Sequence, residues 1–222
     1  MEKKWVYSFA EGDGKNKQLL GGKGANLCEL TQSGIRVPPG FVITTEACLS
    51  YLNDPHRTLP HDLMEQVKTH LRSVEEAMHR RFGEKKKPLL VSVRSGSAMS
   101  MPGMMDTILN LGLNQDTLEG LIHDTGNERF CYDAYRRFIQ LFGKVALGVP
   151  DELFDEAFEQ IKKQAQVTQD IDLSARDLKD ICKKFLQVVE RYTAKPFPHD
   201  PNEQLEIAIK AVFNSWMGKR AV

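Results

Sequence analysis

The sequence predicts an α+β fold in which a mixed first half is followed by an all-helical segment. Four short apolar runs, at residues 5–9, 41–44, 89–94 and 107–113, predict strands. From about residue 116 to residue 195, apolar residues instead recur every three or four positions, which is the spacing of helices that bury one face. A chain of 222 residues can form one or two hydrophobic cores.

The composition excludes several classes of partner. Lys plus Arg and Asp plus Glu number 30 each, so the net charge is zero and no basic field predicts a nucleic-acid partner. No apolar run is long enough to span a membrane and no signal peptide precedes the first predicted strand, so we expect a soluble cytoplasmic protein. The cysteines lack CxxC spacing and are predicted to be reduced, mostly core residues: Cys28, Cys48, Cys131 and Cys182.

A glycine-rich turn opens the first predicted helix. It consists of Gly21, Gly22, Lys23 and Gly24. Leu27 and Leu30 then keep helical spacing, and Gly34 stands where a helix would end. The positive end of a helix together with a lysine favours an anion. The motif is not a P-loop, since Gly24 follows the lysine where a P-loop has Ser or Thr, and taken alone it also fits a flexible surface turn with a solvated lysine.

The next segment predicts a strand and two helices. The sequence VPPG forms a rigid turn before the strand at 41–44, and Thr45 is predicted to cap a helix that runs through Tyr51. Apolar residues at spacings of four and three over residues 63–82 predict an amphipathic helix closed by Gly83.

Residues 89–107 combine a strand with a loop of small residues. Alternation along the strand places Ser92 and Arg94 on one face, so that Arg94 stands at the carboxyl end, where open α/β sheets hold their ligands. The loop offers backbone N–H donors at Ser95, Gly96, Ser97 and Gly103. A guanidinium beside such donors suits an anionic phosphate. A salt-bridged arginine followed by an ordinary turn fits the same residues.

The second half predicts three helices with apolar stripes, followed by a connector and a final helix. The stripes fall within residues 130–145, 153–161 and 178–192, and Ser174 with Asp177 forms a capping-box-like start for the third. Asp200 and Pro201 start the final helix well, with Trp216 on its buried face. These aromatic stripes are predicted to be core rather than cofactor contacts.

Several stretches together resemble the ATP-binding region of the pyruvate, phosphate dikinase family. They are WVYSFAEGDG and LLGGKGANLCEL within residues 5–30, SVRSGSAMSMPGMMDTILNLGL at residues 92–113, and CYDAYRRFIQLFG at residues 131–143. The resemblance covers essentially the whole chain. Because the family's polypeptides are several times longer, we expect this chain to be a truncated part of one.

The resemblance implies an incomplete ATP-grasp-type nucleotide-binding fold with an all-helical inserted subdomain. Residues 1–113 would form the α/β subdomain, residues 114–197 the helical subdomain, and residues 198–222 a helix returning to the first subdomain.

The family's reaction implies roles for particular residues. Its enzymes convert ATP, pyruvate and phosphate to AMP, phosphoenolpyruvate and diphosphate through a phosphohistidine on a separate swivelling domain. By motif match, Arg94 is expected to clamp the β- and γ-phosphates and Lys23 the phosphate chain, as the catalytic residues. The residues implied to contact ATP are Gly21, Gly22, Lys23, Gly24, Arg94, Ser95, Gly103 and Thr107. The methionine-rich loop after Arg94 would be either a lid over the phosphates or a contact surface for the mobile domain.

Other parts of the family's machinery are not found in this sequence. None of the six histidines stands in the family's Thr-Ser-His-Ala context, and no acidic pair resembles its magnesium ligands. We therefore expect ATP and Mg²⁺ to be used, with the metal ligands and the phosphohistidine domain further along a full-length chain that is typically a homodimer. This piece alone is predicted to be inactive and to bind ATP weakly. The alternatives are a non-catalytic nucleotide-binding or partner-docking module, or a phosphoenolpyruvate synthase that uses water.

Overall fold

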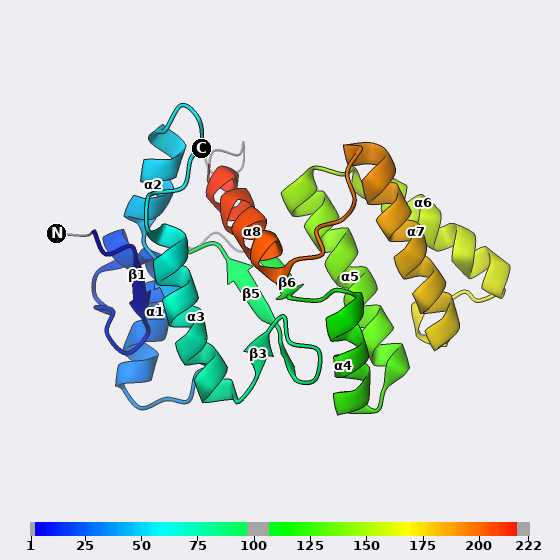
Figure 1. The fold of residues 1–222 in the computed structure, drawn as a ribbon, viewed down its shortest axis with the longest axis horizontal. Helices are drawn as coiled ribbons and strands as arrows, with labels where there is room; N and C mark the ends of the chain where they lie inside the picture. The colour runs from blue at the N-terminus through cyan, green and yellow to red at the C-terminus, as the bar shows by residue number, and fades with distance from the viewer. Residues whose placement is uncertain (1–2, 97–106, 217–222) are drawn as a thin grey trace. The chain divides into compact units, whose positions relative to one another are not determined.

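The computed structural model describes residues 3–96 and 107–216 of the chain (Figure 1). It combines helices with short strands, which confirms the predicted α+β class. The described residues divide into two compact units. The first contains residues 3–81, 94–96, 107 and 212–216, and the second contains residues 82–93 and 108–211. The boundaries proposed from the family resemblance stay a prediction.

The first unit is built on a small antiparallel sheet. Strand β1 (Val6–Ser8) pairs with β2 (Phe41–Ile43), with Tyr7 opposite Val42. Helices α1 (Lys17–Gln32) and α3 (Leu63–Met78) contact this sheet, and α2 (Thr45–Asn53) packs against α1. A core cluster joins α1 to β2 through Leu20, Ala25, Cys28 and Val42.

The second unit is mainly helical. It contains α4 (Gln115–Thr125), α5 (Glu128–Leu147), α6 (Asp151–Ala165), the short 3₁₀ helix η1 (Asp170–Asp172) and α7 (Ala175–Thr193). Its core is aromatic: Phe138, Phe142, Phe154 and Phe185 are all less than 2% exposed. The apolar stripes predicted for this segment are therefore confirmed as core, and the predicted capping box of Ser174 and Asp177 is present.

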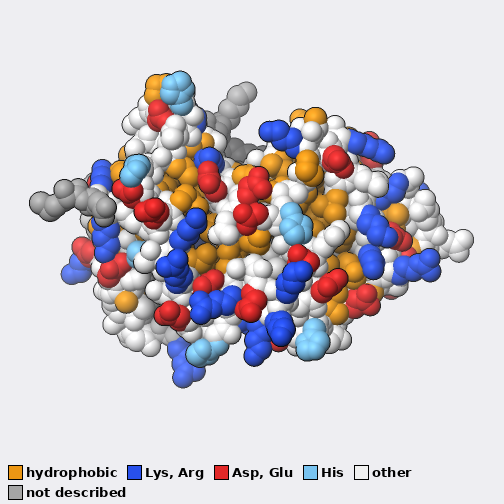
Figure 2. Space-filling model, viewed as in Figure 1, with side chains coloured by type: hydrophobic (Ala, Val, Ile, Leu, Met, Phe, Trp, Pro, Cys, Tyr) orange, Lys and Arg blue, Asp and Glu red, His pale blue; other side chains and the backbone are white. Residues whose placement is uncertain are grey.

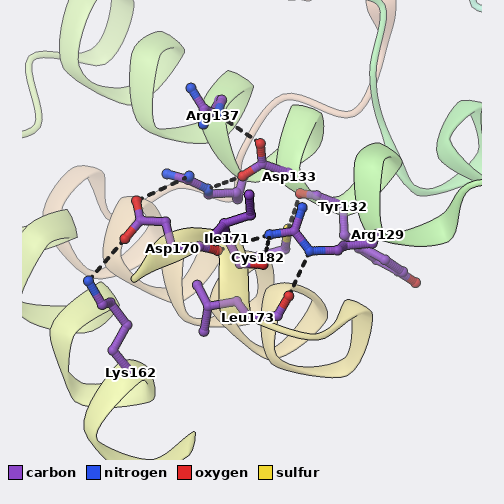
Figure 3. A network of polar contacts seen from close by, with 10 residues as sticks. Arg129, Tyr132, Asp133, Arg137, Lys162, Asp170, Ile171, Leu173 and Cys182 are labelled. Carbon is purple, nitrogen blue, oxygen red and sulfur yellow. Dashed lines mark hydrogen bonds and ion pairs between the residues drawn. The ribbon is translucent and has the colours of Figure 1, made fainter. Parts of the chain in front are cut away.

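A polar network holds η1 and the start of α7 against α5 (Figure 3). The Arg129 guanidinium donates to the backbone carbonyls of Leu173 at 2.8 Å, Asp170 at 2.9 Å and Ile171 at 2.8 Å. The Asp170 carboxylate accepts from Lys162 of α6 at 3.0 Å. Three backbone carbonyls of this connection are thus paired with one cation, which orders the chain between α6 and α7.

The last helix, α8 (Pro201–Ser215), begins in the second unit, and its residues from Val212 onward belong to the first. Its start is fixed by Gln204, which is fully buried. The Gln204 side chain accepts from the Gly112 N–H at 3.0 Å and donates to the carbonyls of Leu113 at 3.0 Å and Pro198 at 2.9 Å. All three backbone groups are paired through one amide, and these hydrogen bonds offset the cost of burying this polar side chain.

Strands β3 (Arg81–Phe82) with β4 (Pro88–Leu89), and β5 (Val91–Arg94) with β6 (Thr107–Leu111), form two further two-stranded sheets. No larger sheet occurs among residues 3–96 and 107–216. The comparison of Arg94 with ligand-binding positions in an open α/β sheet therefore has no support in the described part of the chain.

Several predicted boundaries are wrong by a few residues. Thr44, not Thr45, caps α2, because its hydroxyl accepts from the Ala47 N–H at 3.2 Å. Helix α3 ends at Met78 rather than Phe82, because His79 adopts a left-handed conformation with φ of 52°.

The surface and the cysteines agree with the composition. All four cysteines are free and buried, as predicted, and burial raises the pKa of the Cys48 thiol to about 12. On the face drawn in Figure 2, basic and acidic side chains are interspersed. No helix in the described ranges has the length and apolar character needed to cross a membrane.

Candidate functional site

The glycine turn interrupts helix α1. Gly21 has φ of 68° and ψ of 164°, values outside the helical region, so α1 consists of two helical segments with a kink between them. The second segment starts with Gly22, Lys23 and Gly24. This agrees with the predicted turn at the start of a helix, although a short helical turn from Lys17 precedes it. Positive partial charge is expected at the start of the second segment.

The glycine turn lies directly against the end of strand β5. A Cβ atom built on Gly21 would lie 1.5 Å from the carbonyl oxygen of Gly96, a distance that no side chain can occupy. Conversely, a Cβ built on Gly96 would be 3.8 Å from the carbonyl oxygen of Leu20 and 4.0 Å from the backbone nitrogen of Gly24. The two backbones therefore pack against each other with no side chain between them, and Gly21 is required both by its positive φ and by this contact.

This contact brings together the two sequence segments that were predicted to share an anion. Lys23 is two residues after Gly21, and Arg94 is two residues before Gly96. Both side chains are exposed, and both segments belong to the first compact unit. Across the ranges that the structure describes, neither Lys23 nor Arg94 forms an ion pair or a side-chain hydrogen bond. The alternative interpretation of Arg94 as a salt-bridged strand end is therefore not supported within those ranges.

The alternation predicted for strand β5 is confirmed. Val91 and Val93 are half-buried, whereas Ser92 and Arg94 are exposed. Ser95, the next residue, is 6% exposed, so it points to the opposite side from Arg94. Thr107, at the start of β6, is half-buried in the same unit. Gly103 and the methionine-rich loop lie outside the described residues.

Helix α2 contacts the elements on both sides of the site. The Thr45 hydroxyl donates to the Gln18 carbonyl in the first turn of α1. On the other side, Asn214 of α8 donates to the Tyr51 hydroxyl at 3.1 Å, and the ring of Phe213 packs on that of Tyr51 with a centroid separation of 5.6 Å. Because Tyr51 is only 3% exposed, the end of α8 is fixed on the core of this unit.

The sequence analysis missed one contact next to Arg94. Trp216 follows α8, and its indole N–H donates to the Ser95 hydroxyl at 3.0 Å. The sequence predicted Trp216 as a residue of a buried helix face, but the contact joins residues 121 positions apart. No local spacing can indicate a partner at that separation.

The chemistry available here is that of anion binding. Two cations with no side-chain partner among residues 3–96 and 107–216, backbone without side chains and the start of a helical segment suit a polyphosphate. Within the described residues, no group of three or more His, Cys, Asp or Glu side chains could hold a metal ion.

Comparison with known proteins identifies the family. A family model described as "Pyruvate phosphate dikinase, AMP/ATP-binding domain" matches residues 17–59 and 55–222. The chain belongs to this family. Its matched residues include both the glycine turn and the β5 end, so the resemblance inferred from the motifs is confirmed.

Relatives of the chain carry the corresponding name. It is 55% identical to pyruvate, phosphate dikinase of Entamoeba histolytica over 98% of this chain and 24% of that protein. It is 48% identical to the protein of that name from Rhizobium meliloti, over 99% of the chain and 25% of the relative. It is also 48% identical to the chloroplastic protein of Flaveria trinervia, over 99% of the chain and 23% of the relative. The chain thus spans about a quarter of the length of these relatives.

Proposed function

We propose that this chain is the nucleotide-binding part of a pyruvate, phosphate dikinase, in which Lys23 and Arg94 bind the phosphate chain of ATP. The observation that carries the proposal is the packing of Gly21 against the carbonyl of Gly96. Lys23 is two residues after Gly21 and Arg94 is two residues before Gly96, all in one compact unit, which supports a shared phosphate site. Family membership supplies the ligand, since the matching model is that of an AMP/ATP-binding domain.

The proposed roles follow from the charge that develops during phosphoryl transfer. Negative charge spreads over the non-bridging oxygens, and cations held in position stabilise it. Arg94 offers a planar set of donors that suits two phosphate oxygens at once, and it would clamp the β- and γ-phosphates. Lys23 is a point charge on a flexible stem and would contact the phosphate chain. The backbone of Gly21, Gly22, Gly24 and Ser95, with Gly103 and Thr107, would complete the phosphate contacts.

The complete reaction requires parts outside this chain. The terminal pyrophosphoryl group of ATP would pass to a histidine on a swivelling domain, with release of AMP. Orthophosphate would then accept the outer phosphoryl group to give diphosphate, and the remaining phosphohistidine would phosphorylate pyruvate. We place that histidine, the Mg²⁺ ligands and the homodimer contacts in the remaining three quarters of the full-length protein. The ATP-grasp-type fold, the inserted helical subdomain and a cytoplasmic location belong to the same proposal.

The proposal is tested by AMP formation in the full-length protein that contains this chain. Arg94→Ala is expected to lower the rate by about three or more powers of ten, as loss of a comparable arginine does in other phosphoryl-transfer enzymes. Lys23→Ala is expected to weaken ATP binding. Arg36→Ala and Lys68→Ala are matched controls, because both residues are exposed cations of the same unit and have no side-chain partner in the described ranges.

Unchanged AMP formation in Arg94→Ala would overturn the assignment. If turnover of the full-length protein requires orthophosphate, the protein is a dikinase; turnover without orthophosphate would instead indicate a water-dependent synthase. ATP and Mg²⁺ are also titrated into the 222-residue chain and into the full-length protein. For either enzyme we expect only the full-length protein to bind ATP tightly, whereas a binding module would bind ATP tightly as the 222-residue chain.

A further inference from the structure

The hydrogen bond between Trp216 and Ser95 lies next to the proposed phosphate-binding arginine. The indole N–H donates to the Ser95 hydroxyl at 3.0 Å, and both residues belong to the first compact unit. Ser95 is 6% exposed, whereas Arg94 is exposed. An indole nitrogen can only donate, so in this contact the Ser95 oxygen is the acceptor.

We propose that Trp216 is a positioning residue, which fixes the direction in which Arg94 leaves strand β5. Consecutive side chains of an extended backbone point to opposite sides. Holding the Ser95 side chain on the buried side therefore holds Arg94 on the open side. This inference rests on the proposed function for its catalytic consequence, but the contact itself does not.

Trp216 can serve this purpose because its own segment is anchored. Phe213 and Asn214, which precede it, contact the buried Tyr51 of α2. The Cys48 thiol of α2 also lies 3.9 Å from the carbonyl oxygen of Phe213. Ser95 is thus tied through Trp216 to the helix that also contacts the first turn of α1.

Two contacts with different partners restrain the residues that follow strand β5. Gly96 packs against Gly21, and Ser95 is bound by Trp216. Arg94 itself has no side-chain partner in the described ranges, so its neighbours must set its orientation. Misplacement of a binding group by about 1 Å can cost a hundredfold in rate, which makes such a restraint functionally significant.

The experiment replaces Trp216 by Phe in the full-length protein and measures ATP-dependent AMP formation. Phe keeps a large ring but removes the donor. We expect the rate to fall about tenfold, the equivalent of one lost hydrogen bond, with little change in the unfolding temperature. Trp5→Phe is the matched control, because Trp5 is the other tryptophan of these 222 residues; it is buried, whereas Trp216 is half-buried. Full activity in Trp216→Phe would overturn the proposal.

A double-mutant cycle with Ser95→Ala separates positioning from general packing. Both single variants remove this bond, so the loss of activity in the double variant is expected to be smaller than the product of the two single losses. Multiplied losses would show that Trp216 acts by another route and would contradict the proposal. The cycle also serves if Trp216→Phe folds poorly, because Ser95→Ala alone must then show the tenfold loss.

Fluorescence provides a readout that needs no activity. In the 222-residue chain carrying Trp5→Phe, the tryptophan emission comes from Trp216 alone. Adding Ser95→Ala should shift that emission, because the indole loses its acceptor, and an unchanged spectrum would disprove the contact. If Arg94→Ala lowers activity but Trp216→Phe does not, the further inference fails while the proposed function stands. If Arg94→Ala has no effect, the proposed function fails, whatever the spectrum shows.

Discussion

The candidate site and the helical unit are held together by different means. In the helical unit, large side chains provide the contacts: phenylalanines fill the core, and Arg129 donates hydrogen bonds to three carbonyls (Figure 3). At the site, two backbones meet at Gly21 and Gly96 with no side chain between them, and the cationic side chains have no described partner. The helical unit thus satisfies its own polar groups, whereas the site leaves its cations available to a ligand.

Adding one methyl group at Gly21 tests whether the site depends on the contact between two backbones. In Gly21→Ala the new Cβ would lie 1.5 Å from the Gly96 carbonyl oxygen, so the two segments must separate. We expect ATP-dependent AMP formation in the full-length protein to fall by more than about a hundredfold, as for a misplaced binding group.

Gly34→Ala isolates backbone strain from this clash. Gly34 has a similar positive φ of 77°, but a Cβ there would meet nothing within 4 Å. It should cost about 1–2 kcal/mol of stability and leave activity per folded molecule unchanged. Equal activities in the two variants would contradict the proposed importance of the glycine contact.

Removing the Arg129 guanidinium tests whether side-chain contacts stabilise the helical unit. Arg129→Met deletes three hydrogen bonds to carbonyls, and we expect the free energy of unfolding to fall by about 2–4 kcal/mol, measured by urea denaturation. Activity per folded molecule should not change.

Arg137→Met is the matched control for Arg129. Arg137 pairs with Asp133 at 2.9 Å, but its side chain is 65% exposed. We therefore expect Arg137→Met to lower the free energy of unfolding by only about 0–1 kcal/mol. If Arg129→Met were as mild as Arg137→Met, the network would not stabilise the unit.

The smallest expected effect concerns pH. Partial burial raises the pKa of Glu11, but hydrogen bonds from Lys4, the Ser8 N–H and His70 outweigh burial and lower the pKa from 4.5 to about 2. Because the folded-state pKa is depressed, the stabilisation is present above about pH 4.5 and is lost as the pH falls towards 2.

Glu11→Gln should therefore lower the unfolding temperature at pH 7 and lose this difference from wild type near pH 2. Glu46→Gln is its control, since Glu46 forms an exposed ion pair with Lys3. A difference that persisted unchanged at pH 2 would show that the Glu11 carboxylate is not the cause.

The sequence predicted the helical half well, because its signal is local. Apolar spacing within each helix identifies the buried face, and Phe138, Leu178 and Phe185 are buried as their spacing indicates. At the site, the glycine turn and Arg94 could be selected as motifs. Their adjacency could not, because the contact of Gly21 with Gly96 depends on tertiary packing across 75 residues of chain. The hydrogen bond between Trp216 and Ser95 could not be predicted for the same reason.

The most direct test of the account is a crystal structure of the full-length protein with Mg²⁺ and a non-hydrolysable ATP analogue. We predict that the Lys23 ammonium and the Arg94 guanidinium both lie within hydrogen-bonding distance of phosphate oxygens, at about 2.7–3.2 Å. A phosphate chain bound away from the contact between Gly21 and Gly96, with either cation directed elsewhere, would contradict it.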